Sequence, residues 1–167
     1  VDFTGGSLRN AIPFEACAEI LVPEENKKAV LDTVNEIFAS VKAEFIDSDP
    51  SAVLYVDAVQ AAPKFIQGSV MLRAVKAILA CPAGVVRMSR TMEGLTETST
   101  NLAIVRTQRG HITIHSLMRS AVDSSKAYLA EKMRCLFSLA GAEISFSGGY
   151  SGWTPKLDTP MNKIMMD

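Results

Sequence analysis

The sequence predicts an α+β fold, a two-layer sandwich with helices on one face of a mostly antiparallel sheet. Two segments, 24–46 and 122–140, carry apolar residues at helical spacing. Two adjacent segments near the middle, 95–107 and 110–119, have the pattern of a β-hairpin. Further helices and strands mix along the chain, in the predicted order β-α-β-α-β-β-β-α-β. A hairpin inside such a mixture favours antiparallel pairing.

The first predicted strand and the first predicted helix lie on either side of a proline. Residues 15–22 (EACAEILV) are rich in Cys, Ile and Val, and Pro23 closes the strand. A proline is tolerated in the first turn of a helix, where the helix dipole also favours Glu24 and Glu25. We therefore predict a helix over 24–46. Its apolar face comprises Val30, Val34, Ile37, Phe38, Val41 and Phe45.

Two strands and a shorter helix are predicted next. Residues 52–61 (AVLYVDAVQA) alternate in the manner of a strand, and residues 85–88 are a short strand candidate. The turn of the hairpin lies near residues 108–110. The shorter helix ends before Pro82, and its apolar residues are Met71, Leu72, Val75, Ile78 and Leu79.

The last third of the chain contains one predicted helix and one predicted strand. We expect Asp123 to cap the start of the helix over 122–140 and Gly141 to fit its end. Residues 142–147 (AEISFS) are predicted to form a last strand, and residues 148–160 a loop.

Composition restricts the class of protein. The chain has 167 residues, of which 48% are hydrophobic and 21% charged, as in one globular domain of ordinary size. Its net charge of −1 provides no basic surface for nucleic acid or for an anionic membrane. No stretch has the pattern of a membrane span or of a signal peptide. These features predict a cytoplasmic protein.

The three cysteines predict neither a disulfide framework nor a zinc knuckle. Cys17, Cys81 and Cys135 are far apart and form no CxxC pair. We expect three buried thiols in a reducing compartment.

The reactive residues of this chain do not predict a complete active site. His111 and His115 alternate with isoleucines as on a strand, which separates them by about 13 Å. That distance is too long for two imidazoles to share one metal ion at about 2 Å from each. The glycine pairs lack the spacing of a phosphate loop, and no serine has the context of a nucleophile elbow. No metal site is predicted.

Two residues are candidates for ligand binding. Asn10 lies beside a proline-defined turn ahead of the first predicted strand, and Arg119 ends the second strand of the hairpin. An arginine with an amide is suited to binding a carboxylate, and strand ends with their adjoining loops commonly present such groups. In the simpler alternative, Asn10 satisfies a local turn and Arg119 is a solvated strand end.

Five runs of residues resemble, in the same order, motifs of the zinc-dependent aminoacyl-histidine dipeptidases. The run GGSLRNAIPFEA at 5–16 is similar to their GG-x-x-RNAIP-R-EA element, and AGAEISFSGGYSGWTP at 140–155 resembles their AGA…YPGW-x-P. The resemblance covers nearly the whole chain. The other three runs are CPAGVVRMS (81–89), GLTETSTNLAIV (94–105) and MRSAVDSSK (118–126).

This resemblance implies that the chain supplies the lid of a larger enzyme whose catalytic domain is separate. Residues 1–147 would be most of a lid and dimerisation domain, without its opening histidine-containing segment and first helix. Residues 148–167 would return toward a catalytic domain that holds two zinc ions. The chain starts at Val1 rather than Met, so we expect a segment of a longer protein. The metal ligands and the general base would lie outside it, and the isolated chain would bind no catalytic zinc and be inactive.

The resemblance also implies a substrate and two binding residues. The parent enzyme would be a homodimer that hydrolyses Xaa-His or similar dipeptides. The motif asparagine matches Asn10 and the motif arginine matches Arg119, whose implied role is to bind the dipeptide carboxylate and the reacting carbonyl. Two positions depart from the motifs: Phe14 replaces an arginine, and Ser151 replaces the proline of YPGW. The alternative to an enzyme lid is a non-enzymatic α+β module for dimerisation or small-molecule sensing.

Overall fold

The computed structural model describes residues 2–60 and 65–153. Within this range the chain divides into two compact units. The smaller unit contains residues 18–65, and the larger one contains residues 2–17 together with the chain from residue 66 onward. Among the described residues, no helix is both long enough and apolar enough to cross a membrane.

The smaller unit is built around one long helix. A single 3₁₀ turn, Glu24–Asn26, leads into α1, Lys27–Glu44. The predicted helix over 24–46 is confirmed. Glu24 lies in the first turn, where it also forms an exposed ion pair with Lys27 (3.6 Å).

The strand predicted over 52–61 is wrong for the part that the structure describes. Residues 52–60 have no regular secondary structure, and residue 61 lies outside the described range. The side chains of Val53 and Tyr55 are 64% and 81% exposed. Strand propensity stabilises a strand through neighbouring strands and a buried face, and this segment has neither.

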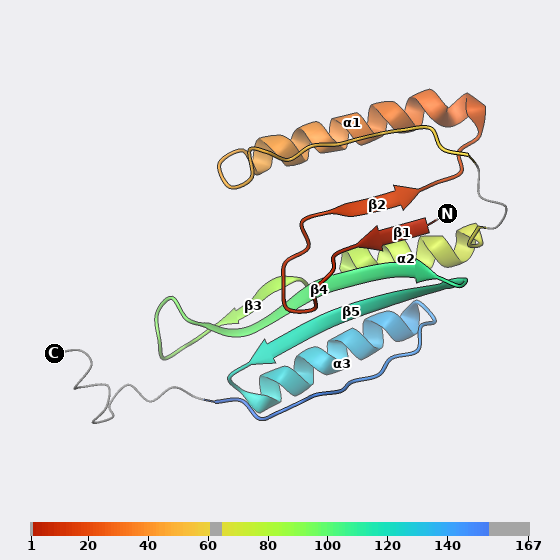
Figure 1. Ribbon diagram of the computed structural model, residues 1–167. Helices are drawn as coiled ribbons and strands as arrows, with labels where there is room; N and C mark the ends of the chain where they lie inside the picture. The colour runs from red at the N-terminus through yellow and green to blue at the C-terminus, as the bar shows by residue number, and fades with distance from the viewer. Residues whose placement is uncertain (1, 61–64, 154–167) are drawn as a thin grey trace. The chain divides into compact units, whose positions relative to one another are not determined.

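The larger unit contains most of a five-stranded sheet, and strand β2 continues from it into the smaller unit (Figure 1). Its strands are β1 (Asp2–Gly5), β2 (Ala16–Glu19), β3 (Gly84–Met88), β4 (Thr96–Gln108) and β5 (His111–Ser120). The long strand β4 is central: it pairs antiparallel with β1, β3 and β5, and β2 pairs with β1. The predicted strands at 15–22, 85–88 and in the hairpin are confirmed, whereas the four-residue β1 was not expected.

The hairpin turn and the strand register determine which side chains share a face. Arg109 and Gly110 both have positive φ (52° and 79°), as a two-residue type I′ turn requires. The β4–β5 register shifts once, between Leu102 and Ile104, so that Ala103 forms a bulge. On either side of this bulge, successive residues alternate between the two faces of the sheet.

Two helices cover one face of the sheet, which we call the helix face. They are α2 (Gly68–Ala80) and α3 (Asp123–Leu139), both of which were predicted. Ile114 and Met118 of β5 pack against them. The predicted α+β class and the predominantly antiparallel sheet are confirmed. The core cluster on this face contains Ala77, Cys81, Met133 and Phe137.

The ends of α3 agree with the sequence only in part. Gly141 has φ +77°, and the amide groups of Gly141 and Ala142 donate to carbonyls of the last turn, so the predicted glycine end is confirmed. The predicted Asp123 cap is wrong. Val122 is the capping residue, and the Asp123 carboxylate binds elsewhere, to Lys126 and to the Gly152 amide.

The strand predicted over 142–147 is also wrong, because this segment lies along a helix instead of a strand. After α3 the chain turns and runs back beside it (Figure 1). Ile144 packs against the core, the Phe146 ring lies 5.0 Å from the guanidinium carbon of Arg134, and the Gly152 amide reaches Asp123 at the start of α3. The apolar alternation therefore marks an extended chain that packs Ile144 against the core and has no strand as its partner among the described residues.

The cysteines differ in environment. Cys81 is buried in the core, and burial raises the pKa of its thiol. Cys17 and Cys135 are exposed, so the expectation of three buried thiols is wrong for these two. Cys17 lies on β2, all of whose residues are exposed, and Cys135 lies on the side of α3 away from the core.

Candidate functional site

The second face of the β4–β5 ladder, which α2 and α3 do not cover, carries the candidate binding residues; we call it the open face. Arg119 is paired with Ser99, and Leu117 with Asn101. Since Met118 points toward the helices, its neighbours Leu117 and Arg119 point to the open face, together with their partners Ser99 and Asn101.

The loop between β1 and β2 carries Asn10 and begins against the bulge of β4. The Gly6 amide donates to the Glu15 carbonyl (3.2 Å), which closes the base of the loop. A Cβ atom on Gly6 would lie 1.9 Å from the Ala103 carbonyl oxygen, and its φ is +70°. Only glycine satisfies both requirements. The glycine pair at 5–6 therefore has a structural explanation in this close approach.

Asn101 fixes the part of the loop that contains Asn10. Its Nδ2 atom donates to the carbonyl of Ala11 (2.6 Å) and, more weakly, to that of Arg9 (3.4 Å). These carbonyls lie immediately before and immediately after Asn10. Because Asn101 belongs to the open face, the same contacts place residues 9–11 over that face.

The side chain of Asn10 takes no part in holding its own turn. The turn is closed by the Ala11 amide, which donates to the Leu8 carbonyl (3.3 Å), and by Asn101. The Asn10 side chain is exposed and makes no hydrogen bond with another described residue. Both its donors and its acceptor remain available to a ligand.

Arg119 is held firmly at the backbone and is exposed at the side chain. On one side of it Met118 packs in the core, and on the other the Ser120 hydroxyl lies 2.8 Å from that of the buried Thr98. Its guanidinium makes no ion pair with any carboxylate among residues 2–60 and 65–153. A fixed backbone and an unpaired planar donor group are suited to binding a carboxylate in two parallel hydrogen bonds.

A polar cluster connects two strands, β3 and β4, to α3, and sequence reasoning did not identify it. The side chain of Glu97 is only 12% exposed, accepts a hydrogen bond from Ser125 (3.1 Å) and lies 3.6 Å from Arg87. Arg87 also donates to the Ser125 hydroxyl (3.1 Å). Each of these residues belongs to a different one of the runs at 81–89, 94–105 and 118–126, which is the only signal in the sequence that could have brought them together.

A second polar contact attaches the chain after α3 to the same end of the sheet. The Asp123 carboxylate accepts from Lys126 (2.8 Å) and from the Gly152 amide (2.8 Å), and Lys126 also donates to the Tyr150 carbonyl. The Lys126 hydrogen bond, followed by that of the Gly152 amide, lowers the pKa of Asp123 below its usual value. A Cβ atom on Gly152 would lie 2.4 Å from the Ala121 carbonyl oxygen, so this contact requires glycine.

The described residues do not fit a zinc site. No group of three histidine, cysteine, aspartate or glutamate side chains is placed to hold a metal ion in 2–60 or 65–153. His111 and His115 both lie on β5, opposite Gln108 and Ile104 respectively, and are exposed. The strand location predicted for them is confirmed.

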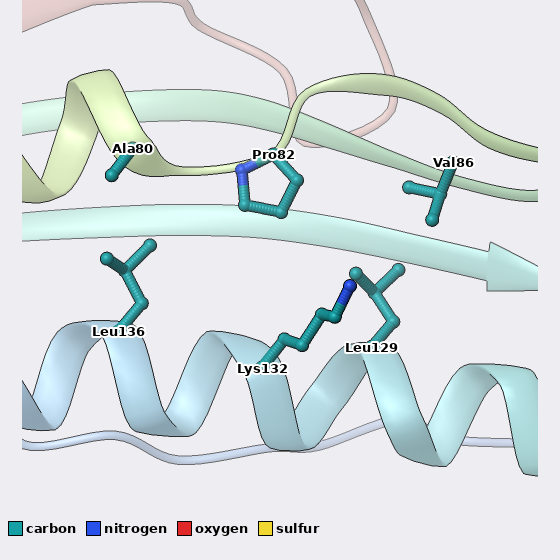
Figure 2. Close-up of a pocket in the computed structure, with 6 residues that line it drawn as sticks. All are labelled: Ala80, Pro82, Val86, Leu129, Lys132 and Leu136. Atoms are coloured by element: carbon teal, nitrogen blue, oxygen red, sulfur yellow. The ribbon is translucent and has the colours of Figure 1, made fainter.

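A groove of about 260 Å³ lies on the helix face, away from the candidate residues (Figure 2). Figure 2 shows Lys132 extending from α3 with its ammonium beside the Leu129 side chain. The ammonium of Lys132 lies 4.8 Å from the centre of the Tyr128 ring. The lining residues are Ala80, Pro82, Val86, Leu129, Lys132 and Leu136.

Comparison with known proteins identifies relatives over the whole of this segment. The chain is 32% identical, over all 167 residues, to the cytosol non-specific dipeptidase of Escherichia coli (strain K12), of which it covers 34%. It superimposes on the crystal structure of the aminoacylhistidine dipeptidase from Vibrio alginolyticus with a TM-score of 0.92 and 35% identity, over 98% of this chain and 34% of that one. No family model matches the chain.

The similarity is continuous but covers only part of each relative. The chain spans about a third of the length of both dipeptidases. Identity above 30% over the whole chain, together with near-complete structural superposition, confirms the resemblance that the five sequence runs indicated. This chain is homologous to about one third of the length of each of these two dipeptidases.

Proposed function

We propose that this segment is the lid and dimerisation part of a zinc-dependent dipeptidase that hydrolyses Xaa-His or similar dipeptides. In this proposal residues 1–147 form the lid and residues 148–167 lead back toward a catalytic domain. Asn10 and Arg119 bind the C-terminal carboxylate and the reacting carbonyl of the dipeptide when the lid closes. Closure of this kind orients the substrate and excludes water from it.

One observation carries the assignment of the two binding residues. Asn101 brings the turn around Asn10 onto the same face of the sheet as Arg119, and neither of the two side chains has a partner in the described part of the chain. An exposed amide and an exposed guanidinium can bind a peptide carbonyl and a carboxylate when both lie on one face and on fixed backbones. The simpler alternative for Asn10, that its side chain satisfies the local turn, receives no support from these hydrogen bonds.

The zinc ions and the general base belong, in this proposal, to parts of the parent enzyme outside this segment. The chemistry supplied there is a metal-activated water. This segment supplies groups that bind and orient the dipeptide substrate. The full-length protein is expected to hydrolyse dipeptides and to lose activity on chelation, and the 167-residue chain alone is expected to be inactive. Turnover by the isolated chain would contradict the proposal.

A homodimeric, cytoplasmic parent completes the proposal. The name of one relative describes a cytosolic enzyme. In the described part of the chain β5 pairs on one edge only, with β4, which leaves a ten-residue edge as a surface for further pairing. Sedimentation of the full-length protein tests the dimer, and the mass of a single chain at micromolar concentration would contradict it.

The experiment that tests the proposal is the substitution Arg119→Ala in the full-length protein. Loss of a charge-assisted contact of about 1.5–3 kcal/mol corresponds to a roughly 10- to 100-fold rise in KM or fall in kcat. Arg119→Lys is expected to recover only part of this, because lysine keeps the charge and loses the planar fork. Steady-state kinetics on a dipeptide series provide the measurement.

Arg106 offers a matched control. Like Arg119 it is an exposed arginine of the hairpin, but it lies on β4, paired with Thr113 near the turn end. Arg106→Ala removes the same charge and is expected to leave kcat and KM within about twofold of the parent. Equal effects of the two substitutions, or unchanged kinetics in Arg119→Ala, would overturn the role of Arg119.

A further inference from the structure

Asn101 occupies an unusual position between the two candidate binding residues. It is a polar residue in the middle of β4, and its side chain binds the chain ninety residues earlier. Its single amide nitrogen donates to the carbonyl before Asn10 and to the carbonyl after it, at 3.4 and 2.6 Å. The backbone of Asn10 is thereby held on both sides by one side chain.

The geometry requires an amide at this position. A primary amide nitrogen carries two hydrogens, which allows one Nδ2 atom to serve two acceptors. Aspartate has the same shape but would place a charged oxygen against two carbonyl oxygens, so it replaces two attractions by two repulsions. Leucine has a similar size and would leave both carbonyls without a donor.

The strand register also places Asn101 close to Arg119 on the open face. Asn101 is opposite Leu117, and Ser99, two residues earlier on the same face, is opposite Arg119. Asn101 and Arg119 are therefore diagonal neighbours across the ladder, for which the separation is about 7–8 Å. A turn bound by Asn101 lies within side-chain reach of the guanidinium.

We propose that Asn101 is the positioning residue of the substrate-binding pair: it sets the position of Asn10 relative to Arg119, and it acts on the substrate only through Asn10. This inference rests on the proposed role of Asn10 and Arg119. It assigns to Asn101 no contact with the dipeptide. Without Asn101, the loop keeps the backbone hydrogen bonds from Ala11 to Leu8 and from Gly6 to Glu15, and the close contact of Gly6 with Ala103.

The test is a double-mutant comparison in the full-length protein, with Asn10→Ala, Asn101→Asp and the two combined. If Asn101 acts only through Asn10, Asn101→Asp lowers kcat/KM by about the same factor as Asn10→Ala. The combined variant is then no more than about twofold worse than Asn10→Ala alone. Asn35→Asp, which makes the same chemical change at an exposed position of α1, is the control for the added charge.

A second measurement is independent of activity. Hydrogen exchange of peptides covering residues 8–11 is expected to speed up in Asn101→Asp and to stay unchanged in Asn35→Asp and Asn10→Ala. Unchanged exchange in Asn101→Asp would overturn the anchoring role. If the factors by which the two single substitutions lower kcat/KM multiply in the combined variant, Asn101 acts independently of Asn10. That result would also overturn the proposal. If exchange speeds up but Asn10→Ala has normal kinetics, the anchor stands and the proposed role of Asn10 in binding fails.

Discussion

The two faces of the β4–β5 ladder differ in how they use their residues. On the helix face, Met118 and Ile114 pack with α2 and α3, and Thr98 and Thr100 are almost completely buried. On the open face, the side chain of Asn101 binds a loop, and Arg119 remains exposed. One face therefore stabilises the fold and the other presents polar groups to a ligand. The difference predicts that substitutions on the helix face lower stability, whereas those on the open face lower binding.

The largest expected effect tests the helix face. Phe137 belongs to the core cluster and is 8% exposed, so Phe137→Ala is expected to cost about 3–5 kcal/mol in the free energy of unfolding. Leu139 lies two residues further along α3 and is 86% exposed, so Leu139→Ala is expected to change it by less than about 0.5 kcal/mol. Urea denaturation of the full-length variants provides the comparison. Similar losses from both would show that another part of the protein covers Leu139.

An intermediate effect is expected where the loop rests on the bulge of β4. Gly6→Ala would bring a Cβ atom against the Ala103 carbonyl at a positive φ. We expect this substitution to lower the free energy of unfolding by more than about 1–3 kcal/mol. We also expect it to lower kcat/KM, because it would move Asn10. Gly110→Ala has a positive φ but open space around it, so only the backbone cost of about 1–2 kcal/mol is expected. Thermal unfolding and dipeptide kinetics distinguish the two. Equal stability losses would contradict the close contact at Gly6.

The smallest effect is expected at the contact between Asp123 and Gly152. The pKa of Asp123 is lowered in the folded protein, mainly by Lys126. Its contribution to stability is therefore complete above the usual aspartate pKa of about 3.9 and is lost as the pH falls through the lower folded-state value. An NMR titration of the Asp123 carboxylate is expected to show a midpoint below 3.9. Lys126→Met is expected to raise that midpoint, and no change would contradict the assigned cause.

The helices and the hairpin were predictable because their signals are local. Helical spacing of apolar residues fixed α1, α2 and α3, and the Arg109–Gly110 turn fixed the β4–β5 hairpin. The segments 52–61 and 142–147 were mistaken for strands because alternation indicates an extended chain but says nothing about what lies beside it. In the second case the neighbour is α3.

The candidate site was predictable only as two separate residues. Asn10 and Arg119 stood out by chemistry and by motif, and their roles remain predictions. Asn101, which links them, was missed because its hydrogen bonds to Arg9 and Ala11 cross ninety residues of sequence. Asn101 follows five other polar residues of β4, Thr96 to Thr100, so its polarity did not distinguish it in the sequence.

The path of the chain after α3 has a mechanical consequence. Because residues 142–153 retrace the helix, the Gly152 contacts with Asp123 and Ala121 bring the chain back to the end of β5, two residues beyond Arg119 (Figure 1). A force applied to the chain beyond residue 153 would therefore be received first at the junction between β5 and α3, two residues along the chain from Arg119, before it reaches the core cluster.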